Sequence, residues 1–154
     1  MYIWIIAGAA AMGALIVAVL LRRRRNRYCP SDIDLMEGHD FEYYCAELLR
    51  RRGFQEVEVT KGSGDYGIDI LAEKDGVTYA IQCKRYTAPV GVKAIQEAYA
   101  GRDYYDRMVG VVLTNQYFTQ PAVEAAKKLK ILLWDRGYLE EVLREGSEEF
   151  LKQF

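Results

Sequence analysis

Residues 64–86 of the chain read GDYGIDILAEKDGVTYAIQCKRY. Two runs of alternating hydrophobic residues in this stretch are separated by Asp75-Gly76, a dipeptide that favours the two-residue turn of a β-hairpin. Facing residues in such a hairpin have numbers with a constant sum, so Asp69 is predicted to lie opposite Gln82. We expect the rest of the domain to be built around this hairpin.

Three polar side chains of the hairpin are expected to share one face. Side chains alternate between faces along a strand, so Gln82 and Lys84 lie on the same face and Asp69 projects from it. Directly opposed residues have Cβ atoms about 5 Å apart, which gathers a carboxylate, an amide and an ammonium into a patch that fits a metal ion and a phosphate. The alternative is the polar outer face of an ordinary hairpin, and a one-residue bulge would separate Asp69 from Gln82. The spacing alone leaves both interpretations open.

The bulk composition is that of a folded domain with an appendage. The chain has 154 residues, and its aromatic fraction of 12% favours a packed core over disorder. Its three cysteines, Cys29, Cys45 and Cys83, are an odd number without metal-ligand spacing. Cys45 and Cys83 fall in helix and strand patterns, so we expect buried free thiols and a reducing compartment.

Charge is unevenly distributed along the chain. The formal net charge is −1, and five arginines lie within residues 22–27. Without these five, residues 28–154 carry a net charge of −6, which disfavours binding to nucleic acid through the overall field. A nucleic-acid partner would therefore have to be held by local basic groups and metal.

The N-terminal region has the pattern of a membrane anchor. Residues 2–21 are apolar and uncharged, and about 20 such residues span a bilayer as a helix. The arginines that follow predict a single pass through the inner or plasma membrane, with the N-terminus outside and the rest of the chain cytoplasmic. A cleaved signal peptide fits less well, because its basic region would precede the apolar run. We expect a transmembrane helix with its stop-transfer segment at 1–27, a linker at 28–36 and a folded domain at 37–154.

Hydrophobic periodicity predicts the remaining elements of the domain. We expect a helix from residue 37 to a stop at 53, a strand at 54–60, a helix at 92–105, a strand at 108–113, a helix at 119–129, a strand at 130–134 and a helix starting near 138. The last two strands read as buried, and the inner face of the 92–105 helix is predicted to comprise Val92, Ile95, Ala98 and Tyr99. An antiparallel hairpin followed by alternating helices and strands predicts an α/β fold, with a mixed β-sheet and helices on both faces.

Glu42, on the first predicted helix, is a further candidate ligand. It shares a helical turn with Cys45 and Leu49, so it stands at the edge of the buried face. A carboxylate there is either a rim residue in contact with water or a ligand that reaches into a site, and the helix pattern leaves both open. His39, the only histidine, is expected to face solvent near the helix start.

Five short motifs follow one another along the predicted domain. They are Phe41-Glu42, residues 64–69, residues 82–86, residues 112–119 and residues 133–135. In order and spacing they resemble the catalytic domain of Mrr-type restriction endonucleases, a branch of the PD-(D/E)xK nuclease superfamily. The resemblance covers roughly residues 37–143, and it implies a restriction-endonuclease-like fold in which the polar face of the hairpin is functional.

The resemblance also implies roles for individual residues. Asp69 matches the metal-binding aspartate, and Gln82 and Lys84 match the QxK form of the catalytic motif. Glu42 matches a helix glutamate that adds a second carboxylate, and the main-chain carbonyl of Cys83 would complete a site for Mg²⁺ or Mn²⁺. Groups expected to contact DNA near this site are Lys61, Asp65, Arg85 and Lys93.

The implied function is that of a membrane-anchored, Mg²⁺-dependent DNA endonuclease acting in defence against foreign DNA. Its expected partners are DNA and, through the N-terminal helix, membrane lipid. One alternative is a structure-selective nuclease of the junction-resolving kind, which would require a homodimer. The other is a non-catalytic nuclease-fold module that binds nucleic acid or protein at the membrane.

Overall fold

The computed structural model describes residues 33–61, 64 and 66–151 of the chain. The predicted membrane helix, Cys29 and Asp65 lie outside these residues. Within them, no helix combines the length and the apolar composition needed to cross a bilayer. The described elements in chain order are α3 (Gly38–Arg51), β1 (Gln55–Val59), β2 (Ile70–Lys74), β3 (Val77–Lys84), α4 (Val92–Tyr104), β4 (Val109–Thr114), α5 (Gln120–Leu129), β5 (Ile131–Trp134) and α6 (Arg136–Leu151).

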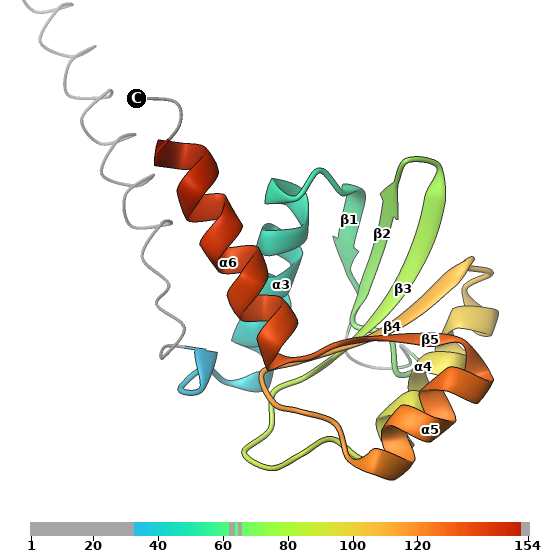
Figure 1. The fold of residues 1–154 in the computed structure, drawn as a ribbon. Helices are drawn as coiled ribbons and strands as arrows, with labels where there is room; N and C mark the ends of the chain where they lie inside the picture. The colour runs from blue at the N-terminus through green and yellow to red at the C-terminus, as the bar shows by residue number, and fades with distance from the viewer. Residues whose placement is uncertain (1–32, 62–63, 65, 152–154) are drawn as a thin grey trace, which may run out of the picture. The chain divides into compact units, whose positions relative to one another are not determined.

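The five strands form one mixed sheet in the order β1-β2-β3-β4-β5 (Figure 1). The strands β1, β2 and β3 are antiparallel neighbours, whereas β3, β4 and β5 run parallel. The pairing of β1 with β2 is irregular between Gln55 and Glu58, at the outer side of the hairpin. The predicted mixed sheet is therefore confirmed, and β3 is its central strand.

The central hairpin has the predicted register. Lys74 pairs with Val77, and the pairing continues residue by residue to Ile70 and Ile81. The turn residues Asp75-Gly76 have φ angles of 53° and 76°, and positive φ at both positions gives the type I′ turn that matches the twist of the flanking strands. Just before β2, the Asp69 N–H donates a 2.9 Å hydrogen bond to the Ile81 carbonyl. Ile81 is already the partner of Ile70, so the one-to-one register ends at that pair.

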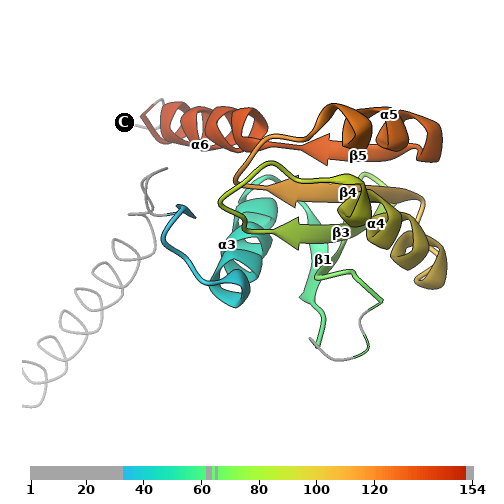
Figure 2. The same cartoon turned by 90° about the horizontal axis from the view of Figure 1, so that it is seen from below.

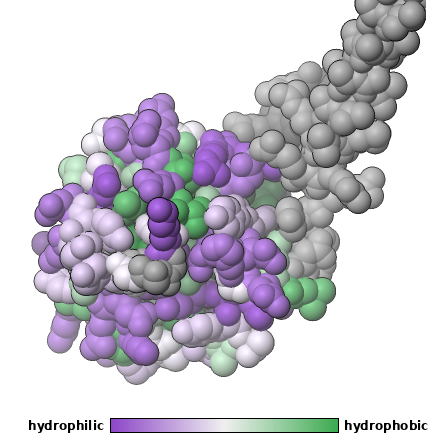
Figure 3. All heavy atoms as spheres, turned by 180° about the vertical axis from the view of Figure 1, so that it is seen from behind, coloured by the Kyte–Doolittle hydropathy of each residue, from purple (hydrophilic) through white to green (hydrophobic). Residues whose placement is uncertain are grey.

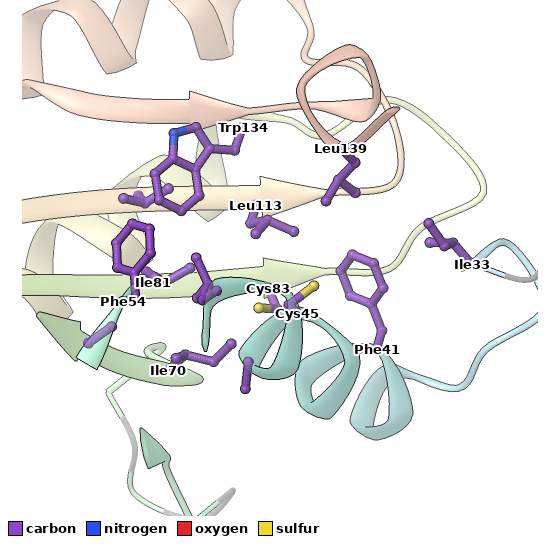
Figure 4. Packing of buried hydrophobic residues seen from close by; sticks show 14 of the residues in the cluster. Ile33, Phe41, Cys45, Phe54, Ile70, Ile81, Cys83, Leu113, Trp134 and Leu139 are labelled. Carbon is purple, nitrogen blue, oxygen red and sulfur yellow. The ribbon is translucent and has the colours of Figure 1, made fainter. Parts of the chain in front are cut away.

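Helices cover both faces of the sheet, as predicted (Figures 1 and 2). The helices α3 and α6 pack on one face, through a cluster that includes Phe41, Ile81 and Leu139 (Figure 4). The helices α4 and α5 pack on the other face, through a second cluster that includes Ile95 and Val112. Because side chains alternate along β3, its even-numbered polar residues face α4 while its odd-numbered apolar residues face α3.

The inner face of α4 differs from the predicted one. Its buried residues are Ala94, Ile95, Ala98 and Gly101. Val92 is only half-buried, and Tyr99 is exposed, with its ring 4.8 Å from the Arg102 guanidinium carbon. A Cβ on Gly101 would overlap Ile68 and would lie 2.8 Å from the Tyr66 carbonyl oxygen. Small residues therefore let α4 approach the segment before β2 more closely than a bulky apolar stripe would allow.

The strand β5 is not the second fully buried strand that its apolar run predicts. It lies at the edge of the sheet with a strand neighbour on one side, and Leu132 is 46% exposed. The start of the preceding strand was also predicted too early, because Met108 is exposed and β4 begins at Val109. A continuous apolar run cannot distinguish an edge strand from a central one when both are covered by helices.

The two described cysteines are buried free thiols, as predicted. Cys45 on α3 and Cys83 on β3 lie side by side in the larger cluster (Figure 4). A hydrogen bond with Cys45 and burial together raise the pKa of Cys83 well above its ordinary value, so its thiol is protonated at neutral pH. Both cysteines therefore act as small core residues.

The folded unit begins before α3. Ile33 and Met36, which fall within the segment predicted as a linker, are buried in the larger cluster. The compact unit accordingly spans residues 33–154. Its surface is largely hydrophilic on the face seen in Figure 3, with apolar areas that are small and scattered.

Candidate active site

The polar residues of the hairpin meet where β3 ends and β2 begins. Asp69 and Gln82 are both buried, and Gln82 Nε2 donates a 2.9 Å hydrogen bond to Asp69 Oδ2. The same oxygen accepts a 2.6 Å bond from the Cys83 main-chain N–H. The side chains of Asp69 and Gln82 therefore meet, and both bonds fix the carboxylate against the end of β3.

The Gln82 amide has one satisfied end and one unsatisfied end. A carboxylate only accepts hydrogen bonds, so the NH₂ end must face Asp69 and Oε1 must point away from it. This Oε1 is buried and finds no hydrogen-bond partner in residues 33–61, 64 and 66–151. A buried acceptor without a partner is uncommon in folded proteins and points to a water molecule or an ion as its missing partner.

Lys84, the last residue of β3, is held in place by a residue of α4. Its Nζ lies 2.8 Å from Oε2 of Glu97. Burial alone lowers the pKa of Lys84, but the hydrogen bond and charge of Glu97, with the charges of Tyr86 and Asp69, more than offset it, so the pKa lies above its ordinary value. Lys84 is therefore a fixed ammonium at neutral pH.

A glycine brings α4 and the hairpin together at this point. Gly67 has a φ of 76°, and a Cβ built on it would lie 3.0 Å from Gln82 Oε1 and 3.0 Å from Glu97 Cβ. A side chain here would need both a left-handed backbone and space that Gln82 and Glu97 occupy. The segment before β2 therefore packs between the strand amide and the helix glutamate.

Glu42 is half-buried on α3, the helix on the other face of the sheet. Its Oε2 lies 3.1 Å from Nδ1 of His39, which is exposed as predicted. Its negative charge contributes, after the Cys45 hydrogen bond, burial and Asp69, to the raised pKa of Cys83. Glu42 thus lies within electrostatic range of Cys83 while its direct partner belongs to its own helix.

The basic residues expected near DNA differ in their surroundings. Lys61 is exposed, and Lys93 is 88% exposed on α4 with its Nζ 3.8 Å from Glu97 Oε1. Arg85 is half-buried, and its Nη1 lies 3.5 Å from the Asp34 carbonyl oxygen. Asp65 lies outside the described residues. Lys61 and Lys93 are therefore open to solvent, whereas Arg85 turns toward the segment before α3.

A polar network that includes two residues of the 112–119 motif, to which the sequence assigned no individual role, supports the end of β3. Asn115 accepts a 2.9 Å bond from the Tyr86 N–H and donates to the Tyr86 carbonyl at 2.9 Å. The Thr114 hydroxyl donates to the Lys84 carbonyl at 2.7 Å. Asn115 also donates to Asp34, whose carboxylate accepts bonds from Arg136. In the sequence, the signal for this network is the polar pair Thr114-Asn115, which directly follows the apolar run of β4.

Comparison with known proteins identifies the family. The profile of the restriction endonuclease family Mrr_cat matches residues 33–143. The chain belongs to this family. The Mrr_cat match begins at Ile33, where the compact unit begins, and includes each of the candidate catalytic residues.

Two solved structures have a similar fold. Protein AF1548, described as of unknown function, aligns with a TM-score of 0.57 and 25% identity over 73% of this chain and 67% of its own. The DNA modification-dependent restriction endonuclease AspBHI aligns with a TM-score of 0.54 and 19% identity over 70% of this chain. The chain spans only 31% of AspBHI, so the likeness is one of fold. No curated protein sequence matches the chain.

The side chains at this site can be compared with the ligands that a divalent metal ion requires. Within the described part of the chain, no three side chains of His, Cys, Asp or Glu gather as a metal cluster. The Asp69 carboxylate and the unsatisfied Gln82 Oε1 are nevertheless oxygen donors of the kind that hard cations prefer. The donor set therefore fits such an ion through a mixed set of carboxylate and amide oxygens.

Proposed function

We propose that this chain is a membrane-anchored, Mg²⁺-dependent endonuclease that hydrolyses phosphodiester bonds in DNA. The Mrr_cat restriction endonuclease domain supports nuclease chemistry. The single observation that carries the proposal is the buried Asp69–Gln82 pair, with Lys84 next along the same strand face. An acid, an amide and an ammonium held this way are poorly explained as an ordinary polar surface, because two of the three are buried.

Asp69 would be the principal metal ligand, and Gln82 its support. The hydrogen bonds from Gln82 and from the Cys83 N–H fix the orientation of the carboxylate. Glu42 and the Cys83 carbonyl, implied by the family motif, would complete the site. A bound Mg²⁺ or Mn²⁺ supplies a water of lowered pKa and neutralises charge on the phosphate.

Lys84 would stabilise charge and orient water. The ion pair with Glu97 favours the protonated form of Lys84, which suits an ammonium that stabilises charge. A fixed ammonium beside the metal would instead donate to a phosphate oxygen as negative charge develops there. The metal would lower the pKa of the attacking water, whose proton would pass to bulk solvent, and the lysine would stabilise charge.

DNA is the proposed substrate. The family assignment supports it, and the neighbouring fold of AspBHI belongs to a DNA modification-dependent restriction endonuclease. The exposed Lys61 and Lys93 offer positive charge near the site, against the negative charge of the domain as a whole. Asp65 and Arg85 would act in shaping the approach to Asp69 and Lys84 rather than as free phosphate contacts.

The proposed location is the cytoplasmic side of the inner or plasma membrane. It rests on the apolar residues 2–21 followed by five arginines. A tethered nuclease would meet foreign DNA where that DNA enters the cell, which is the defence role we propose. A chain lacking residues 1–27 should then protect cells less well against incoming DNA, and unchanged protection would refute the tethering role.

Cleavage is tested with the full chain purified in detergent. Supercoiled, linear and branched DNA are incubated with Mg²⁺, with Mn²⁺ and with EDTA, using wild type and the isosteric variant Asp69→Asn. We expect metal-dependent nicking that EDTA and the substitution abolish. Binding without cleavage would favour a non-catalytic module, and cleavage of branched DNA alone by a dimer would favour a junction-type nuclease.

A further inference from the structure

Glu97 lies at the polar patch without having been singled out by any motif. It projects from α4, the helix that packs on the face of β3 bearing Gln82 and Lys84. Its carboxylate is half-buried, with Oε2 2.8 Å from Lys84 Nζ and Oε1 3.8 Å from the exposed Lys93 Nζ. Lys84 is thus the close partner, and the glutamate is directed at the hairpin.

Gly67 shows how near Glu97 comes to the unsatisfied amide oxygen. The position that a Cβ of Gly67 would take is 3.0 Å from Gln82 Oε1 and 3.0 Å from Glu97 Cβ. These two atoms are therefore separated by no more than twice that distance. The carboxyl carbon of a glutamate lies two bonds beyond Cβ, and rotation about the Cα–Cβ and Cβ–Cγ bonds would turn it from Lys84 toward Gln82 Oε1.

A divalent cation bound at the patch would need a second carboxylate. Gln82 is neutral, so Asp69 is the negative side chain among the three hairpin residues of this patch, Asp69, Gln82 and Lys84. Divalent cations in hydrolytic sites are held by oxygen ligands that include carboxylates. Lys84 carries the positive charge at this place, and it pairs with Glu97.

We propose that Glu97 is a metal ligand of the active site, which binds a hard divalent cation through Asp69, Gln82 Oε1 and Glu97 once the Gln82 amide turns from its hydrogen bond with Asp69. The buried and unsatisfied Gln82 Oε1 is the independent sign that a ligand belongs between the strand and α4. When Glu97 turns to the cation, Lys84 is released from its ion pair and its ammonium becomes available to a phosphate oxygen. The inference rests on the proposed nuclease function and deepens it.

Metal affinity tests the proposal without relying on activity. Mn²⁺ binding to the full chain is measured by titration calorimetry, and free Mn²⁺ by electron paramagnetic resonance, in the absence of DNA. Glu97→Gln is expected to weaken Mn²⁺ binding at least about tenfold, the lower end of the effect that metal-supporting residues exert. The matched control is Asp103→Asn, which removes the same charge from the same helix at an exposed position and should leave the affinity unchanged.

A second readout separates ligation from a structural role. Mn²⁺ should raise the thermal unfolding midpoint of the wild type, and this rise should shrink in Glu97→Gln. If Glu97 serves only to pair with Lys84, the variant unfolds at a lower temperature without metal, yet gains as much from Mn²⁺ as the wild type does. That result, or equal Mn²⁺ affinity, would overturn the assignment of Glu97 as a ligand.

The two proposals fail in distinguishable ways. If the wild type binds Mn²⁺ and cleaves DNA while Glu97→Gln binds Mn²⁺ equally well, only the ligand assignment falls. If the wild type neither binds Mn²⁺ nor cleaves DNA, the nuclease proposal falls as well. Glu97→Asp keeps the charge with a shorter reach, and intermediate Mn²⁺ binding by that variant would support ligation should Glu97→Gln fail to fold.

Discussion

The helices α3 and α4 lie on opposite faces of the sheet, and each carries one half-buried glutamate near the catalytic hairpin. Glu42 on α3 pairs with His39 of its own helix, whereas Glu97 on α4 reaches across to Lys84 on β3. The first contact joins residues one helical turn apart, and the second joins residues from two elements. The comparison shows that the contact between a helix carboxylate and the polar patch depends on how closely its helix packs on the sheet. Its position in a sequence motif does not decide this contact alone.

The difference in packing has a local cause. Gly101 allows α4 to touch Ile68 and the Tyr66 carbonyl, and Gly67 fits between Gln82 and Glu97. On α3, the residues that face the sheet are bulkier and include Phe41 and Leu49. The face that carries the polar patch is therefore the one on which helix and hairpin approach most closely.

The largest expected effect comes from removing Asp69, the carboxylate that the hairpin contributes to the site. Asp69→Asn should lower the rate of DNA cleavage at least about 10³-fold, as loss of a central catalytic group does. Asp69→Ala should also destabilise the fold by about 1–3 kcal/mol, because two buried donors from Gln82 and Cys83 lose their acceptor. Plasmid nicking and urea unfolding measure the two effects, and an active Asp69→Asn protein would refute the site.

The two glutamates can be ranked directly. Glu97→Gln should reduce the cleavage rate about 10–100-fold, and Glu42→Gln by a smaller factor, since Glu42 is paired with His39 of its own helix. Both substitutions preserve side-chain size and remove one charge, so each is the control for the other. Single-turnover cleavage at saturating Mg²⁺ gives the ranking, and the reverse order would return the second carboxylate to α3.

Adding a methyl group to each helix tests the difference in packing. Gly101→Ala should destabilise the domain by about 1–3 kcal/mol, because its Cβ would overlap Ile68 beside the start of β2. Gly38→Ala at the start of α3 meets no atom of the described residues within 4 Å and should change stability by less than about 0.5 kcal/mol. Urea unfolding measures the stability of both variants. Equal losses of unfolding free energy would contradict this account.

The smallest expected effect concerns the segment that leads into α3. Hydrogen bonds from Asn115, together with those from Arg136 and its charge, hold the pKa of Asp34 below its ordinary value. The stabilisation is complete above the pKa of the unfolded chain and is lost as pH falls through the lower folded value. Asp34→Asn should therefore cost less than about 1 kcal/mol at neutral pH, because the Arg136 pair is partly exposed, and less still in acid.

An unfolding series from neutral pH downward checks this behaviour. The gap between wild type and Asp34→Asn should narrow as the medium becomes more acidic. A gap that stays constant with pH would mean that the Asp34 charge does not contribute and that only the hydrogen-bond geometry matters.

Local patterns predicted much of the domain, because several of its contacts are set by near neighbours in sequence. The Asp75-Gly76 turn alone predicted the register from Lys74–Val77 to Ile70–Ile81, and Thr119 caps α5 as its position before Pro121 predicts. The exposure of His39 and the burial of Cys45 also followed from helical spacing. The edge position of β5 and the exposure of Tyr99 did not, because an apolar run or stripe records hydrophobicity and not what covers it.

The sequence by itself determined the hairpin, the mixed sheet and the family, because turn chemistry and strand alternation act over a few residues. Only the tertiary structure decided that Lys84 is paired with Glu97, that Gln82 Oε1 is left unsatisfied and that Arg85 turns toward Asp34. The first two of these outcomes depend on how closely α4 packs on β3. That closeness is set by Gly67 and Gly101, which act through the volume they leave empty.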